Sequence, residues 1–229
     1  MARHRTWMSW SSGKDSTLAL AEARRDPGLE VVGLLTTVNE DADRVAMHAV
    51  RRSLLEDQAD ALGLPLHVVL IPQACRNETY EQRMGAAVDA ARADGVTRMV
   101  FGDLYLADVS AYREQMMAPT GIEPVFPLWG RSTPELAREM LAAGIRATLT
   151  CVDPAQLDAG FVGRDFDESL LAELPGEVDP CGENGEFHTF VHDGPGFAHP
   201  LDVRVGEVVE RDGFVFADVI TTMPGDFAR

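Results

Sequence analysis

TWMSWSSGKDSTLALAEARR, residues 6–25, sets the architecture of the whole chain. Residues 6–10 predict a short strand, residues 11–16 a loop of small polar side chains, and residues 17–25 a helix rich in Ala and Leu. The N-terminus of a helix presents unpaired N–H groups and the positive end of the helix dipole. A strand, a small-residue loop and a helix start in this order therefore predict a site for an anion such as phosphate.

The side chains of the loop suit a bound phosphate. Its serines supply hydroxyl donors, its glycine lets the backbone approach a ligand, and its lysine supplies positive charge. Its aspartate is placed to cap the helix or to hold a phosphate-bound Mg²⁺. The candidate nucleotide-binding residues are Ser11, Ser12, Gly13, Lys14, Asp15 and Ser16. A serine-capped helix start without a ligand is the alternative interpretation.

The spacing of the loop differs from that of the common P-loop, Gly-x-x-x-x-Gly-Lys-Ser/Thr. Met8 stands at the first glycine position, and Asp15 follows the lysine. The loop instead resembles the Ser-Gly-Gly-x-Asp-Ser signature of the PP-loop ATP pyrophosphatases, which cleave ATP between the α and β phosphates. Ser12 stands where that signature has its second glycine.

The composition indicates a globular protein with an acidic surface. The chain has 229 residues, of which 45% are hydrophobic, enough for a sizeable core, and its formal net charge is −17. Such a charge repels a nucleic-acid backbone, so we expect no nucleic-acid partner. No apolar run approaches the length of a transmembrane helix, so we expect no membrane association. The cysteines at 75, 151 and 181 are far apart, which favours a reducing, cytoplasmic location.

Strands and helices alternate as far as residue 152. The pattern predicts further strands at 30–38, 66–71, 99–102, 125–126 and 146–152, and helices at 48–62, 78–93, 106–117 and 133–143. Strands separated by helices form a parallel sheet with helices on both faces, so the predicted fold class is α/β, doubly wound. Ligands of such sheets bind at the C-terminal ends of the strands.

The composition changes after residues 153–154, where Gly and Pro become dense and helical periodicity weakens. We therefore predict two domains. Residues 1–152 bind ATP, and residues 153–229 form a small α+β domain that binds the acceptor substrate. Residues 203–220 predict a β-hairpin around Asp212-Gly213.

A second informative run, DPCGENGEFHTF at residues 179–190, combines turn-forming residues with carboxylates, an amide and a histidine. Glu183 and Glu186 are close in sequence, and we expect both to line one side of a pocket. Close carboxylates raise one another's pKa, which suits a general base. A solvated acidic turn is one alternative, and a zinc site formed by Cys181, Glu183, Glu186 and His188 is another.

Four motifs together resemble those of the diphthine–ammonia ligase family, a branch of the PP-loop ATPases. They are Ser-Ser-Gly-Lys-Asp-Ser at 11–16, Phe-Gly-Asp at 101–103, Pro-Leu-Trp at 127–129 and Gly-Glu-Asn-Gly-Glu-Phe-His-Thr at 182–189. The resemblance implies that ATP with Mg²⁺ adenylates a substrate carboxylate, that pyrophosphate leaves, and that ammonia attacks to form an amide. In the family the carboxylate belongs to diphthine, a modified histidine of translation elongation factor two.

The resemblance also implies roles for individual residues. The superfamily strand order 3-2-1-4-5 opens a crevice between the first and fourth strands, where Gly102 and Asp103 face the loop. Asp15 and Asp103 are then the candidate Mg²⁺ ligands, although a ribose contact or a loop cap is an alternative for Asp103. Thr36, Thr37 and His48 are assigned to the nucleotide. The acceptor and its chemistry are assigned to Lys14, Glu114, Glu183, Asn184, Glu186 and His188. The alternative for Glu114 is a surface helix charge, and the alternative for His188 is to orient the loop.

Three classes of function are consistent with these observations. The preferred one is an amide-forming ATP pyrophosphatase that acts on a carboxylate of a small molecule or a protein side chain, with ammonia as the second substrate. The others are a non-catalytic ATP-binding or sensing module on the same fold and a tRNA-modifying PP-loop ATPase. The charge of −17 and the absence of a Cys-x-x-Cys pair argue against the third. The sequence does not determine whether the protein forms a homodimer.

Overall fold

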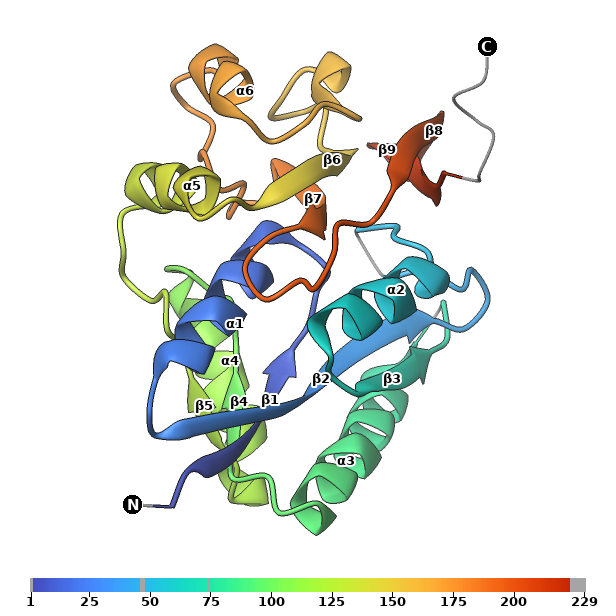
Figure 1. Ribbon diagram of the computed structural model, residues 1–229. Coiled ribbons are helices and arrows are strands. Elements are labelled where there is room, and N and C mark those ends of the chain that lie inside the picture. Colours follow the sequence, from blue (N-terminus) through green and yellow to red (C-terminus); the bar gives the residue numbers. More distant parts are fainter. Residues whose placement is uncertain (1, 46–47, 74, 223–229) are drawn as a thin grey trace.

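The computed structural model describes residues 2–45, 48–73 and 75–222, which contain two β-sheets (Figure 1). The first sheet is parallel and has the predicted strand order, β3-β2-β1-β4-β5. Its strands are β1 (His4–Ser9), β2 (Leu29–Asn39), β3 (Leu66–Ile71), β4 (Arg98–Val100) and β5 (Glu123–Val125). The order places β1 beside β4, where the strand sequence reverses and such sheets bind their ligands.

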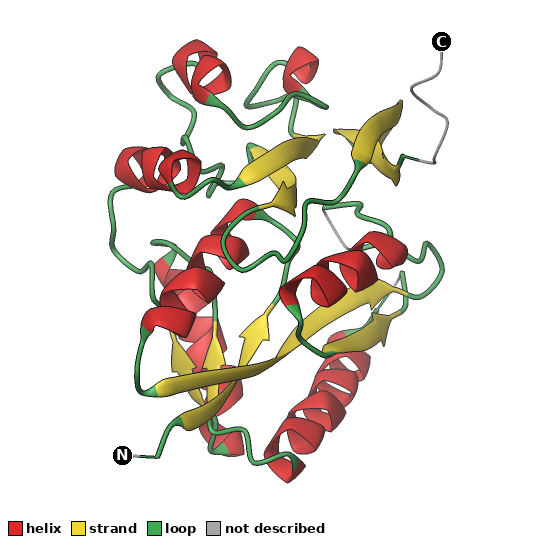
Figure 2. Ribbon diagram, in the orientation of Figure 1, coloured by secondary structure: helices red, strands yellow, loops and turns green. Residues whose placement is uncertain are grey.

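Helices cover both faces of this sheet (Figure 2). They are α1 (Lys14–Arg25), α2 (Arg52–Leu62), α3 (Asn77–Ala93) and α4 (Ala107–Met117), followed by the 3-10 turn η1 (Ala118–Thr120). Neighbouring strand residues point to opposite faces. Met8 packs with Leu18 of α1, whereas Trp7 lies in a separate cluster with Val88 of α3 and Met117 of α4. The predicted doubly wound α/β class is therefore confirmed.

The second sheet is antiparallel, with the order β7-β6-β9-β8. Its strands are β6 (Arg146–Val152), β7 (Phe187–Asp193), β8 (Val203–Arg211) and β9 (Phe214–Thr221). Helix α5 (Thr133–Ala142) leads into the sheet, and η2 (Ala159–Phe161) and α6 (Glu168–Glu173) lie between β6 and β7 along the chain. The predicted hairpin is present, and Asp212 and Gly213 have φ angles of 54° and 84°, the left-handed pair of a type I′ turn.

Strand β6 corrects the assignment of residues 146–152. The alternation of strands and helices predicted that this run belongs to the parallel sheet, but β6 pairs antiparallel with β7 and β9. Every β6 residue after Arg146 is buried, and a strand that is buried on both faces has a continuous apolar sequence in either kind of sheet. The second sheet thus includes residues before the change in composition at 153.

The predicted helix at residues 48–62 begins only at Arg52. Ala49 has a φ angle of 54°, which a right-handed helix excludes, and Arg51 is extended. Nη1 of Arg44 donates a hydrogen bond to the Ala49 carbonyl at 2.7 Å and holds this bend. His48 therefore lies in the loop before α2 and does not start the helix.

A shared hydrophobic core joins the two sheets. The cluster that contains Leu18 and Leu34 from the first sheet region also contains Leu149, Phe187 and Phe190 from the second sheet. As a result, β7 lies against the N-terminal end of α1, next to the predicted ligand site. Within the described residues, no helix is both long enough and apolar enough to cross a membrane.

Candidate functional site

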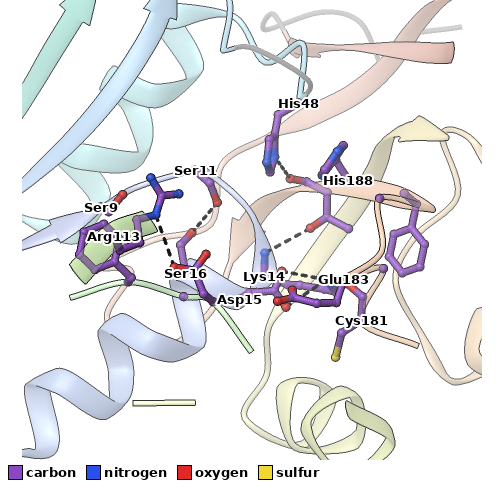
Figure 3. A pocket seen from close by; sticks show the side chains of 17 residues that line it. Ser9, Ser11, Lys14, Asp15, Ser16, His48, Arg113, Cys181, Glu183 and His188 are labelled. Atoms are coloured by element: carbon purple, nitrogen blue, oxygen red, sulfur yellow. Dashed lines mark hydrogen bonds and ion pairs between the residues drawn. The ribbon is translucent and has the colours of Figure 1, made fainter. Parts of the chain in front are cut away.

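A cavity of about 310 Å³ lies between the start of α1, the end of β4 and the loop that leads into β7 (Figure 3). We call it the polar cavity, because hydroxyl, carboxylate and amine groups dominate its lining. The predicted site residues that it brings together are Ser11, Lys14, Asp15, Ser16, His48, Gly102, Asp103, Glu183 and His188. Two segments far apart in the sequence, residues 11–16 and 182–189, thus face the same space.

A second cavity of about 520 Å³ adjoins the first and is lined mainly by apolar side chains of α3 and α4, such as Met84, Val88 and Met116. We call it the apolar cavity. Thr36 and Thr37, which the family resemblance assigns to the nucleotide, lie on its wall at the end of β2. The two cavities share Ser9, Ser11, His48, Phe101, Arg113 and His188. A planar ring with polar edges suits this lining.

Gly102 allows the end of β4 to approach the first turn of α1. A Cβ atom at this position would lie 3.0 Å from the backbone N of Ser16 and 3.1 Å from the carbonyl C of Asp15. Hydrogen bonds within the loop orient its polar side chains. Ser11 Oγ donates to Ser16 Oγ at 3.1 Å, and Ser16 Oγ donates to the Gly13 carbonyl at 2.9 Å. The loop is thus shaped before any ligand binds.

Ser12 and Gly13 shape this loop but are not among the residues that line the polar cavity. Ser12 is fully buried and has a φ angle of 73°, the conformation for which the family signature has glycine. Its carbonyl accepts a hydrogen bond from Val191 N at 2.9 Å. Its hydroxyl oxygen is buried, and among the described residues it has no hydrogen-bond partner.

Gln58 is a positioning residue that motif analysis missed. Its Nε2 donates to the carbonyls of Ser12 at 3.1 Å and Val191 at 2.6 Å, and its Oε1 accepts from Trp10 Nε1 at 2.8 Å. One buried amide therefore ties the end of β1, the loop and β7 together. The sequence carried a signal for it, because Gln58 interrupts the apolar face of α2 next to Leu54 and Leu62.

Replacing Ser12 by glycine is expected to make the protein about 1 kcal/mol more stable than the Ser12→Ala variant. Both substitutions remove the buried hydroxyl, and only glycine also relieves the left-handed backbone. Urea unfolding of the two variants measures the difference. Equal stabilities would show that the φ angle of this residue imposes no strain.

Lys14 is the only lysine of the chain and is buried beneath the loop. Its Nζ lies 3.1 Å and 3.0 Å from the two carboxylate oxygens of Asp15 and donates to the Cys181 carbonyl. The rings of Phe166 and Phe187 flank it, with centroids 5.7 Å and 5.2 Å from Nζ. Burial lowers the pKa of Lys14, but the charge of Asp15 and its neighbours outweighs burial, so the pKa is raised. The ammonium is therefore charged at neutral pH.

The carboxylates predicted to bind Mg²⁺, Asp15 and Asp103, both line the polar cavity. Among the described residues, Asp103 Oδ2 is buried without a hydrogen-bond partner, and the nearest cationic atom is Arg113 Nε at 3.6 Å. Burial raises the pKa of Asp103, the guanidinium of Arg113 lowers it, and the charge of Asp15 raises it further. Mg²⁺ is usually held by one or two carboxylates together with substrate phosphates, and this pair fits that requirement.

Glu183 reaches the polar cavity from the loop before β7. Its Oε1 accepts a hydrogen bond from Leu104 N at 2.9 Å, which orients the carboxyl group. Burial raises the pKa of Glu183 to about 7, against the lowering effects of that hydrogen bond and of Lys14. A carboxyl group with this pKa exchanges protons efficiently at neutral pH.

Glu186 does not line the polar cavity, and this corrects the expectation that it stands beside Glu183. Its buried carboxylate accepts hydrogen bonds from Asp179 N at 3.0 Å, Asn184 N at 2.9 Å and Asn184 Nδ2 at 3.0 Å. Asn184 also lies outside the cavity and is exposed, with its Oδ1 3.0 Å from Tyr105 Oη. Gly182 and Gly185 have left-handed φ angles, so the chain reverses between the two glutamates and they diverge.

Replacing Glu186 by glutamine is expected to destabilise the protein by about 1.5–3 kcal/mol. In the wild type both carboxylate oxygens accept hydrogen bonds from backbone N–H groups, whereas in the variant the amide NH₂ group would face one of these donors. The loop of residues 182–189 would lose order, while the loop of residues 11–16 would stay intact. Thermal unfolding measures the first effect. The exposed variant Glu177→Gln is the matched control, and equal melting temperatures for the two variants would contradict this positioning role.

Glu114 is exposed on α4 and lines neither cavity, so the structure does not bring it together with the other residues predicted for the acceptor. Its neighbour Arg113 lines both cavities instead. Successive residues of a helix point in directions about 100° apart, so neighbouring positions of α4 face different surroundings.

His48 and His188 stack at the boundary of the two cavities, with ring centroids 4.6 Å apart. His48 Nδ1 lies 3.3 Å from the Thr189 carbonyl. Burial, with a smaller contribution from the charge of Lys14, lowers the pKa of His48 to about 4 and that of His188 to about 3. Both rings are therefore neutral at pH 7 and form part of the cavity walls.

The residues of the alternative zinc site contact different partners and do not converge on one point. Cys181 Sγ contacts the Thr133 carbonyl at 3.4 Å, Glu186 holds its own loop, and His188 stacks on His48. Across residues 2–45, 48–73 and 75–222, no three His, Cys, Asp or Glu side chains are grouped closely enough to hold a metal ion by themselves.

Comparison with known proteins gives consistent matches over most of the chain. The family model described as the diphthamide synthase N-terminal domain matches residues 4–124, and the model of the diphthamide synthase C-terminal domain matches residues 132–218. The diphthine–ammonia ligases of Homo sapiens and Bos taurus are 34% and 33% identical, covering 91% of this chain and 86% of each relative. That of Rattus norvegicus is 31% identical over 94% of both chains.

Proposed function

This chain belongs to the diphthamide synthase (diphthine–ammonia ligase) family, and on that premise we propose that it is an ATP-dependent ligase that joins ammonia to a carboxylate. Its relatives are named for diphthine, which makes diphthine the proposed acceptor. One observation carries the proposal. A single cavity contains both the loop at the N-terminus of α1 and a carboxyl group, that of Glu183, whose pKa is about 7.

The first proposed step activates the acceptor. A carboxylate oxygen attacks the α-phosphorus of ATP, the bond from this phosphorus to the oxygen that bridges to the β-phosphorus breaks, and pyrophosphate leaves. Ser11, Ser16 and the N–H groups of the first turn of α1 bind phosphate oxygens, and Lys14 offsets the charge of the leaving group. Asp15 and Asp103 would hold Mg²⁺, which supplies further neutralisation of phosphate charge when bound.

The second proposed step forms the amide. Ammonia attacks the carbonyl carbon of the activated acceptor, the bond from that carbon to the AMP oxygen breaks, and AMP leaves. The attached nitrogen releases one proton to solvent as the neutral amide forms. Ammonia is mostly ammonium at neutral pH and has to lose a proton before it attacks. Glu183 accepts that proton, because its carboxylate is partly buried, faces the cavity and has a pKa near the pH of the reaction.

The two regions of the fold divide this work. We propose that the parallel sheet with α1–α4 binds ATP and that the antiparallel sheet presents the loop of residues 179–189 to the acceptor. We retain the predicted division into two domains as a proposal, but we assign β6 to the second domain, because β6 pairs with strands of the second sheet. The adenine is placed in the apolar cavity, beside Thr36 and Thr37.

Analysis of reaction products tests this function. ATP, Mg²⁺, ammonium and a diphthine-bearing protein are incubated with the enzyme, and the nucleotides are separated by chromatography. We expect AMP and pyrophosphate in amounts equal to the amide formed. Release of ADP and phosphate would contradict the PP-loop assignment, and tight ATP binding without turnover would favour the sensing module.

A further inference from the structure

We propose that Arg113 binds the α-phosphate of the nucleotide, the phosphate that stays with adenosine when pyrophosphate leaves. This inference rests on the proposed function, because it names a ligand for the nucleotide of that reaction. Arg113 lies outside the motifs from which the site residues were predicted, in the middle of α4.

The position of Arg113 gives the first argument. It lines both the polar cavity, where the phosphate loop lies, and the apolar cavity, where the adenine is placed. Its guanidinium carbon lies 5.1 Å from the centre of the Phe101 ring, which also belongs to both cavities. A nucleotide that extends from one cavity into the other passes this boundary at its ribose and α-phosphate.

The charges at the boundary give the second argument. Six residues are shared by the two cavities, namely Ser9, Ser11, His48, Phe101, Arg113 and His188. The two histidines are neutral at pH 7, so Arg113 supplies the positive charge among these six. The ammonium of Lys14, deeper in the polar cavity, already contacts the carboxylate of Asp15 and the carbonyl of Cys181.

The long ion pair between Arg113 and Asp103 gives the third argument. Arg113 Nε is buried, and among the described residues it has no hydrogen-bond partner. Asp103 Oδ2, 3.6 Å away, is beyond hydrogen-bond distance and lacks a partner in the same described part of the chain. A phosphate oxygen between the cavities would give Arg113 Nε a charged acceptor within hydrogen-bond distance, and Asp103 would be free to bind a cation.

A series of ligands isolates the α-phosphate. Isothermal titration calorimetry measures the binding of adenosine, AMP and pyrophosphate to the wild-type protein and to the Arg113→Met, Arg113→Lys and Arg92→Met variants. Arg92 is exposed on α3 and serves as the charge-matched control. We expect Arg113→Met to lower the affinity for AMP about 10–100-fold, to a value close to that for adenosine. The affinities for adenosine and pyrophosphate should change less than about twofold, because neither ligand contains the α-phosphate that Arg113 binds.

The other arms separate this inference from the proposed function. Arg113→Lys keeps the charge and should retain part of the affinity for AMP, whereas Arg92→Met should bind all three ligands like the wild type. If the wild type prefers AMP to adenosine and Arg113→Met retains that preference, the inference about Arg113 is wrong and the proposed function stands. A wild-type protein that binds neither AMP nor ATP overturns both.

Discussion

Replacing Glu183 by glutamine is expected to lower the rate of amide formation by about 10²–10⁴-fold while the affinity for ATP changes little. Glutamine keeps the size of the side chain and its hydrogen bond from Leu104 N, but it cannot accept a proton. The phosphate loop is untouched by this change. Single-turnover kinetics with a diphthine-bearing acceptor and ammonium measures the rate, and calorimetry measures the ATP affinity.

The pH dependence of the rate of amide formation tests the same prediction independently. Below a pH of about 7 the Glu183 carboxyl is protonated and unable to act as a base, so the rate should rise with pH and level off above that value. The Glu183→Gln variant should lose the plateau above pH 7, and its slow rate should follow the fraction of free ammonia, which continues to rise with pH; the exposed control Glu177→Gln should keep the wild-type profile. A Glu183→Gln variant with the full rate and an unchanged pH profile would remove Glu183 from the chemistry.

Replacing Lys14 by methionine is expected to lower turnover about 10²–10³-fold and to destabilise the protein by about 2–3 kcal/mol. Methionine fills the space between the rings of Phe166 and Phe187 but leaves the Cys181 carbonyl and the Asp15 carboxylate without their cation. The partial exposure of Asp15 keeps the loss of stability below that of a fully buried pair. Urea unfolding measures stability, and turnover is assayed at a temperature where the variant is folded.

The control for Lys14 is Arg138→Met, which removes an exposed positive charge from α5. This variant should keep wild-type stability and turnover. If Lys14→Met behaves like Arg138→Met in both assays, the buried ammonium neither supports the loop nor neutralises phosphate charge.

Features that depend on neighbouring residues could be predicted from the sequence. The strand, loop and helix at residues 6–25 form one local unit, and their order determines where α1 presents its N-terminus. The sheet order followed from the resemblance to the PP-loop superfamily. Gly102 and Asp103 could be placed as well, because they directly follow a strand whose C-terminal end meets that of β1.

Features that depend on side-chain direction or on distant contacts could not be predicted. The left-handed Gly182 and Gly185 turn Glu183 toward the cavity and Glu186 into its own loop, and the spacing of the two glutamates does not encode this. The role of Gln58 requires the position of Val191 in a distant strand. Strand β6 consists, after Arg146, of apolar and threonine residues that are all buried, a composition that fits either kind of sheet.

The central claim is that the acceptor carboxylate attacks the α-phosphorus of ATP, and transfer of labelled oxygen tests it most directly. The acceptor is prepared with ¹⁸O in its carboxylate, the reaction is run in unlabelled water with ATP, Mg²⁺ and ammonium, and the products are analysed by mass spectrometry. One ¹⁸O atom should appear in each AMP molecule and none in pyrophosphate. Unlabelled AMP, or ¹⁸O in inorganic phosphate, would contradict adenylation of the carboxylate.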